Sequence, residues 1–181
     1  MATPLAASAR VLAVGAGVAT AAMLVDKSLF SAHPVSTSLA FLACLPDAVL
    51  RSVSAREAST ASERLALLSQ HAIVQSAAAI LGLSGFVSIF AHKASLSKAH
   101  FTSWHGCLGI VVFSSMLLNV LGGALAFKRI GLLQRLPKSL QARVKTAHRF
   151  SGWAVTLTAM ANAVIGLQHP AVHIVRALSL L

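Results

Sequence analysis

Residues 101–127 read FTSWHGCLGIVVFSSMLLNVLGGALAF, and this stretch decides the fold. It contains one histidine, His105, and no lysine, arginine, aspartate or glutamate. An α-helix needs about 20 predominantly apolar residues to cross the hydrocarbon core of a bilayer. Such a helix satisfies its own backbone hydrogen bonds, as a segment surrounded by lipid must. The stretch therefore predicts a transmembrane helix with a histidine close to its first residue.

Four further apolar stretches predict four more spanning helices, over residues 4–25, 34–50, 65–91 and 147–167. Arg10 interrupts the first of them. Its basic start, apolar core and following small residues fit either a retained helix or a signal peptide, and both interpretations stay open. The expected fold class is all-α, a multi-pass transmembrane bundle with a four-helix core. The expected division is an N-terminal helix at 1–27, the core at 28–168 and a short tail at 169–181, in which 171–181 is too short to cross and lies along the interface or on the bundle.

The composition supports a membrane class. Of the 181 residues, 56% are hydrophobic and 10% are charged, whereas a soluble domain is about 25% charged. The net charge is +11, but no basic stripe with interleaved aromatic residues is present, which excludes a nucleic-acid-binding class. Cys44 and Cys107 lie inside apolar runs, where single cysteines behave as small hydrophobic residues. No Cys-x-x-Cys-His sequence occurs, so a covalently attached c-type haem is excluded.

The cations predict the orientation of the bundle. Eleven of the fifteen lysines and arginines fall on the side that holds the N-terminus and the expected loops 51–65 and 128–146. The positive-inside rule makes that side cytoplasmic. The cytoplasmic set is Arg10, Arg51, Arg56, Arg64, Lys128, Arg129, Arg135, Lys138, Arg143, Lys145 and Arg149, and the opposite set is Lys27, Lys93, Lys98 and Arg176.

Four histidines lie at the entry of four successive apolar stretches: His33, His71, His105 and His148. Alternate helices of an antiparallel bundle begin on the same side. This places His33 with His105 near the non-cytoplasmic face and His71 with His148 near the cytoplasmic face. Two facing imidazoles can hold one haem iron and leave it no open coordination position, which suits electron exchange. The pattern predicts two haems, one above the other, in a protein that carries electrons across the membrane.

Three small residues near these histidines allow two interpretations. Gly106 and Gly109 follow His105, and Gly152 follows His148 by four residues, which places it on the same helix face. Each glycine either clears space for a flat macrocycle or lets two helices pack closely. The sequence leaves this choice open.

The other polar residues in or near the spans have simpler explanations. Asp47 precedes Arg51 by one helical turn, and we expect the two to pair. The remaining histidines, all on the non-cytoplasmic side, are expected to be solvated interfacial residues, with His92 as an exception that is explained below: His92, His100, His169 and His173.

The segments around the four histidines resemble the cytochrome b561 family, in particular its small cytochrome b561 domain-containing transmembrane reductases. They are SLFSAHPV at 28–35, AHKASLSKAH at 91–100, SWHGCLG at 103–109 and KTAHRFSG at 145–152. The resemblance covers roughly residues 28–168. Four histidines in order, each with matching neighbours, are a specific signal.

This resemblance implies an oxidoreductase with two non-covalent, bis-histidine haem b groups, held by His33/His105 and His71/His148. It implies ascorbate or a similar cytoplasmic reductant as donor, and monodehydroascorbate radical or ferric iron as acceptor on the far side. A homodimer in an endomembrane or vesicle would also fit. The matched substrate-binding positions are Lys145, with Arg143 and Arg149 beside it, on the cytoplasmic side, and His92 and Lys98 on the far side.

The chain departs from the family pattern in three ways. A sixth span is missing or vestigial, the basic residue often found just before the third-span histidine is absent, and Thr102 stands where the family often has tyrosine. These departures leave the haem sites intact and the identity of the donor open. Two other functions are weaker. A histidine-lined metal-ion or proton pathway lacks polar groups at mid-membrane, where residues 80–85 and 113–120 offer only serine and Asn119, and a haem-less structural subunit would not need four histidines.

Overall fold

The computed structural model describes residues 4–26, 28–127, 130–170 and 172, and within them the chain is helical with short connections. Five helical segments are long and apolar enough to cross a membrane. The all-α, multi-span class is therefore confirmed, and the chain is a multi-pass membrane protein. The elements are α1 (Pro4–Met23), α2 (Leu29–Ser38), the π-helix η1 (Leu39–Cys44), α3 (Leu45–Glu57), α4 (Ala61–Ser95), α5 (Trp104–Ala126), the 3₁₀ turn η3 (Leu133–Arg135) and α6 (Lys138–Leu167).

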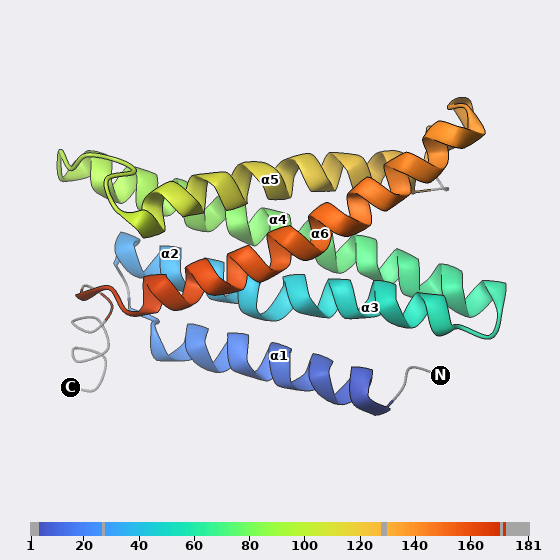
Figure 1. Ribbon diagram of the computed structural model, residues 1–181. Helices are drawn as coiled ribbons and strands as arrows, with labels where there is room; N and C mark the ends of the chain where they lie inside the picture. Colours follow the sequence, from blue (N-terminus) through green and yellow to red (C-terminus); the bar gives the residue numbers. More distant parts are fainter. Residues whose placement is uncertain (1–3, 27, 128–129, 171, 173–181) are drawn as a thin grey trace.

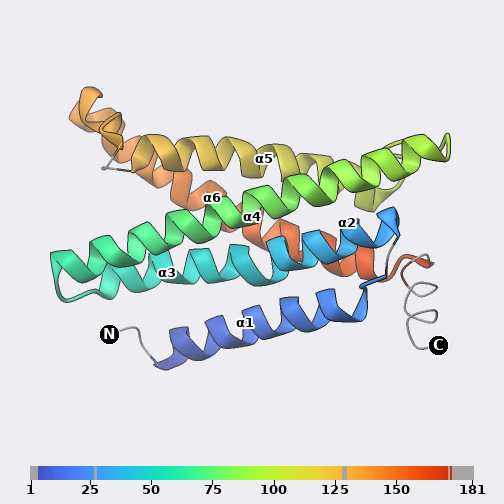
Figure 2. The same cartoon turned by 180° about the vertical axis from the view of Figure 1, so that it is seen from behind.

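The helices run side by side as an antiparallel bundle (Figure 1). α4 packs along the continuous rod formed by α2, η1 and α3, while α5 packs along α6. α1 lies on the outer side of the α2–η1–α3 rod, as both views show (Figures 1 and 2). We call the end that holds the α3–α4 connection the α3–α4 end, and the opposite one the α4–α5 end. α1 and α6 both begin at the α3–α4 end.

A π-helix joins α2 to α3 without breaking the span. The N–H of Leu45 donates to the carbonyl of Ala40, five residues back, in place of the α-helical four. Pro46 follows directly, and its missing N–H is tolerated because a bonding irregularity already lies at this point. η1 also receives α1 very closely, since a Cβ on Gly17 would lie 2.6 Å from the Cβ of Ala43. The rod therefore crosses the bilayer as one span with one extra residue in its middle turn.

Polar caps fix where the helices begin. The Thr60 hydroxyl accepts the N–H of Glu63 as the N-cap of α4, and the Glu63 carboxylate accepts the N–H of Ser59, one residue before the cap. Ser28 and Ser103 cap α2 and α5 in the same way through their hydroxyl groups.

The helices extend further than the apolar stretches predict. α3 continues to Glu57 and α4 begins at Ala61, so most of the expected loop 51–65 is helical. α6 begins at Lys138, which makes the last part of the expected loop 128–146 helical as well. Hydropathy marks the hydrocarbon core, whereas a helix satisfies its own backbone and can run on into water until a cap ends it. The predicted loop boundaries were wrong for this reason.

One ion-pair cluster lies inside the bundle and ties α1 to α3. Arg51 Nε lies 2.7 Å from Asp47 Oδ2, which confirms the expected pair. Arg10 Nε lies 2.6 Å from Asp47 Oδ1, a contact that the sequence analysis did not anticipate. The Asp47 side chain is only 7% exposed and has a cation on each oxygen. The arginine that interrupts the first apolar stretch thus has a carboxylate partner.

The apolar core lies at mid-height, where Phe113 and Met116 of α5 meet Ala78 of α4 and Ala159 of α6. Many other large apolar side chains point outward, as expected for a bundle in lipid. The expected interfacial tail at 171–181, together with Lys27, Lys128, Arg129, His173 and Arg176, lies outside the described residues apart from Val172.

Candidate functional site

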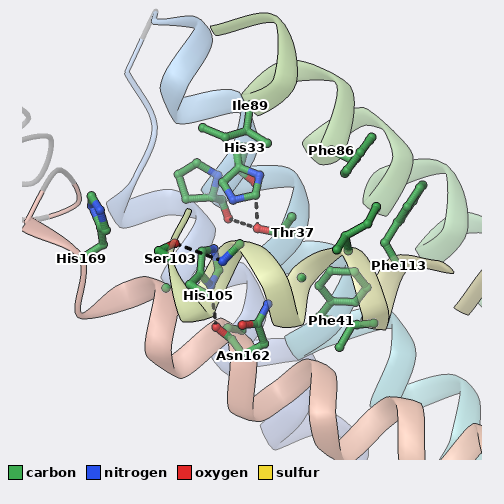
Figure 3. Close-up of a pocket in the computed structure, with 18 of the residues that line it drawn as sticks. His33, Thr37, Phe41, Phe86, Ile89, Ser103, His105, Phe113, Asn162 and His169 are labelled. Carbon is green, nitrogen blue, oxygen red and sulfur yellow. Dashed lines mark hydrogen bonds between the residues drawn. The ribbon is translucent and has the colours of Figure 1, made fainter. Parts of the chain in front are cut away.

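His33 of α2 and His105 of α5 face each other across a cavity near the α4–α5 end (Figure 3). Their ring centroids lie 6.0 Å apart, at an interplanar angle of 71°. His33 Nδ1 lies 2.9 Å from the carbonyl oxygen of Gly85 on α4, and His105 Nδ1 lies 3.1 Å from that of Asn162 on α6. All four helices of the core therefore meet at this pair.

His71 of α4 and His148 of α6 form a second pair toward the α3–α4 end. Their centroids lie 6.2 Å apart, at 79°. His71 Nδ1 lies 2.7 Å from the carbonyl oxygen of Ala48 on α3, and His148 Nδ1 lies 3.1 Å from that of Asn119 on α5. Each pair thus joins two helices through its rings and the other two through backbone carbonyls. Both histidines lie almost three turns inside their helices, because α4 and α6 begin well before the apolar stretches.

The geometry of both pairs fits a shared metal ion of the kind that a haem supplies. A carbonyl oxygen only accepts, so each Nδ1 must carry the proton, which leaves Nε2 as the lone-pair donor in all four rings. Two metal–nitrogen bonds of about 2 Å, plus the distance from each nitrogen to its ring centre, separate two ligand centroids by about 6 Å. The backbone carbonyls are the partners that orient ligating imidazoles in metal sites.

α5 and α6 carry the same internal pattern, which the sequence analysis missed. Both read His-x3-Gly-x9-Asn-x3-Gly, at residues 105–123 and 148–166. The two helices are antiparallel, so the asparagine of each accepts the Nδ1–H of the other's histidine. The signal is visible in the sequence as a repeat with a period of 43 residues. It becomes interpretable only when the helices are set side by side.

The last glycine of each repeat makes room for a histidine ring. A Cβ on Gly166 would lie 2.6 Å from His105 Cε1, and one on Gly123 would lie 2.9 Å from His148 Cε1. Two of the glycines considered from sequence lie against asparagine side chains. A Cβ on Gly109 would lie 3.3 Å from Asn162 Nδ2, and the Cβ contact at Gly152 is the equivalent one, 3.2 Å from Asn119 Nδ2.

The contact at Gly152 favours close helix packing, whereas Gly106 and Gly109 also line the cavity at the His33/His105 pair, so both interpretations stay open at those two positions. Gly106 packs against the Cα of Phe101 in the turn that precedes α5, at 3.3 Å from an added Cβ. Gly123 and Gly166 leave space for the histidine rings themselves, and each lies on the helix next to the one that carries its ring.

Sequence comparison agrees with this geometry. Residues 32–173 match the family described as eukaryotic cytochrome b561. The chain belongs to the cytochrome b561 family. The transmembrane reductase CYB561D2 of Bos taurus is 30% identical over 164 residues, which cover 89% of this chain and 71% of the relative. The protein of that name from Homo sapiens is 31% identical over 166 residues, with the same coverage. The transmembrane ascorbate-dependent reductase CYB561 of Bos taurus is 29% identical over 140 residues, 77% of this chain and 52% of that relative.

Membership of the cytochrome b561 family implies a haem b cofactor, which the two histidine pairs fit. The lining of the cavity at the His33/His105 pair includes the polar residues Lys93, His100 and His169, and Phe86 and Phe113 stack along it at a centroid distance of 4.7 Å. These three polar residues were not among the expected substrate positions.

The expected substrate residues of the α4–α5 end lie beside this cavity. The ring of His92 packs against Phe30, with centroids 5.5 Å apart, and neither His92 nor Lys98 is among the residues that line the cavity. Lys98 is exposed in the turn after α4, where Ser97 adopts a φ of 51°. Their role in substrate binding stays a prediction.

The expected substrate residues of the α3–α4 end all lie on α6 of this cytochrome b561 family member. Arg149 directly follows His148, and its Nε donates to the carbonyl of Lys145 at 3.3 Å. Arg143 and Arg149 are exposed, and Lys145 is half-buried. The three cations thus share the helix that carries His148, close to one histidine pair, and their contact with a substrate also stays a prediction.

Proposed function

We propose that this chain is a transmembrane electron-transfer protein that holds two b haems, one at His33/His105 and one at His71/His148. The carrying observation is that all four histidines meet in pairs with centroids 6.0 and 6.2 Å apart, and that every Nδ1 lies on a backbone carbonyl. A bound haem would supply one-electron redox chemistry at each pair. The chain supplies the ligands, their orientation and a helical sheath that excludes water.

We further propose that electrons enter at the α3–α4 end and leave at the α4–α5 end. The excess of cations at the α3–α4 end supports a cytoplasmic position by the positive-inside rule. Lys145 and Arg149 near His148 would attract an anionic donor such as ascorbate, and one relative is named an ascorbate-dependent reductase. Lys93 and His100, which line the cavity at the His33/His105 pair, would receive an anionic acceptor, either monodehydroascorbate radical or ferric iron in an anionic chelate.

The test is haem content and transfer across a membrane. The His105→Ala variant should bind one haem per chain, and vesicles loaded with ascorbate should no longer reduce ferricyanide outside. His100→Ala is a matched control for haem content alone, because it removes a histidine that lines the same cavity and leaves both pairs complete. Wild-type protein with fewer than two haems, or a His105→Ala variant that still binds two, would contradict the ligand assignment.

The spectrum after addition of ascorbate tests the donor separately. Full reduction of both haems by ascorbate supports it, whereas reduction by dithionite alone keeps the two haems and excludes ascorbate. A histidine-lined metal pathway finds no support in the geometry. Within the described part of the chain, no group of three or more histidine, cysteine or carboxylate side chains could hold a metal ion.

A further inference from the structure

The two repeats on α5 and α6 are alike in backbone but differ in one hydroxyl group. The residue three positions after the histidine is Ser151 in the second repeat and Leu108 in the first. Ser151 Oγ donates to Asn119 Oδ1 at 2.6 Å, which is the shortest of its three possible hydrogen bonds. Leucine has no polar atom, so position 108 cannot make the equivalent bond.

Asn119 therefore acts twice on the His148 side. Its backbone oxygen accepts the Nδ1–H of His148, and its side-chain oxygen accepts the hydroxyl of Ser151, one turn further along α6. Both bonds join Asn119 of α5 to α6 beside the ring of His148. The side-chain oxygen has its negative partial charge partly neutralised by the serine proton.

Asn162 has only the first of these bonds. Its backbone oxygen accepts from His105, as Figure 3 shows, but its buried Oδ1 has no hydrogen-bond partner among the residues that the structure describes. The residue is 7% exposed and lines the cavity at the His33/His105 pair. An amide oxygen whose negative partial charge is uncompensated is thus enclosed beside the His33/His105 pair. Beside the His71/His148 pair the corresponding amide oxygen accepts the serine hydroxyl.

We propose that Asn119 with Ser151, and Asn162 without a donor, are positioning residues that move the reduction potentials of the two haems in opposite directions. The proposal rests on the haem sites of the proposed function. Ferric haem carries one more positive charge than ferrous haem, so negative partial charge near the ligand stabilises the ferric form and lowers the potential. The Ser151 proton removes part of that charge at the His71/His148 haem, whereas no described residue donates to the side-chain oxygen of Asn162 at the His33/His105 haem.

The experiment is a spectroelectrochemical titration of the full chain with two variant pairs. Ser151→Ala should lower the potential of the His71/His148 haem alone, while Ser151→Thr, which keeps a hydroxyl, should hold it near the wild-type value. Leu108→Ser should raise the potential of the His33/His105 haem, and Leu108→Ala is its control for lost volume. Each effect should change the equilibrium constant for one-electron reduction by about two- to tenfold, the size expected of one neutral hydrogen bond.

The outcomes separate this proposal from the proposed function. The single-haem His105→Ala variant assigns the two titration waves, and a haem assay first establishes two haems per chain. With two haems bound, equal shifts for Ser151→Ala and Ser151→Thr, or equal shifts for Leu108→Ser and Leu108→Ala, would overturn the tuning role. A wild-type chain that binds no haem would overturn the proposed function instead. If Ser151→Ala does not load haem, the Leu108 pair still decides.

Discussion

Gly166→Ala should weaken haem binding at the His33/His105 pair and leave the other haem in place. The new methyl group would stand 2.6 Å from His105 Cε1, and ordinary contact begins at 3.4 Å, so the ring must retreat by about 0.8 Å. Metal–ligand distances tolerate about 0.2 Å. The ring cannot retreat freely, because its Nδ1–H is held by the carbonyl of Asn162 on the same helix as the added methyl group.

The expected loss is about 10- to 100-fold in haem affinity at that pair, the usual cost of disturbing the groups that orient a metal ligand. Gly123→Ala is the symmetric change. Its methyl group would lie 2.9 Å from His148 Cε1, so it should weaken the His71/His148 haem by a smaller factor. Haem per chain, measured as the pyridine haemochrome during dilution or competition with apomyoglobin, gives both affinities.

Gly15→Ala is the matched control. An added Cβ there meets nothing within 4 Å, and alanine stabilises a helix interior by about 1 kcal/mol relative to glycine. This variant should keep two haems with wild-type spectra. If Gly166→Ala also kept both haems at wild-type affinity and potential, then the ring does not need the space that this glycine leaves, and the clearance role would be wrong.

Three further predictions follow from the fold. Asp47→Asn should destabilise the bundle by about 3 kcal/mol, measured by thermal unfolding in detergent, because it leaves Arg10 and Arg51 without a buried counter-charge. Arg10→Met should destabilise it by less, because Asp47 keeps Arg51. Hydrogen bonds from Ser28 lower the pKa of Asp26, so the stability that they contribute should be complete above the ordinary carboxyl pKa and lost as the pH falls through the lowered pKa. Asp26→Asn should remove this pH dependence of thermal unfolding, and an acid unfolding profile identical to that of the wild type would contradict the prediction. Deletion of Leu42 from the π-helix should keep both haems, whereas deletion of the exposed Ile80 from regular α4 should lose at least one, as the haem assay would show.

The spans and the histidine pairing could be predicted because each rests on a strong, one-dimensional signal. Residues 101–127 have no charge to end a span, and the order of four histidines along antiparallel helices brings them together in only one way. Helix ends could not be predicted in this way. They depend on caps such as Thr60 with Glu63, which act outside the apolar stretches.

Partners that lie on different helices were also beyond the sequence. Arg10 looked like an interruption of a weak span until Asp47, 37 positions later, proved to hold it. Asn119 was noted only as one of a few polar groups at mid-span, although its backbone oxygen orients His148. The identity of such a residue matters less than the position of its carbonyl, and a carbonyl belongs to every residue type.

The π-helix η1 shows how the two histidine pairs together fix the shape of the α2–η1–α3 rod. On α4, α5 and α6 the residue whose carbonyl holds a ring follows that helix's own histidine by 14 positions, as Gly85 follows His71. On the α2–α3 rod Ala48 follows His33 by 15. Fourteen α-helical residues rise about 21 Å, and this separation between the two layers is common to all four helices.

A fifteenth residue in a regular α-helix would turn the Ala48 carbonyl away from His71 by about 100°, since each residue occupies that share of a turn. The five-residue bond from Leu45 to Ala40 absorbs the extra residue and restores the angle. A single irregular turn in the middle of the rod is thus a consequence of two fixed layers of ligands above and below it.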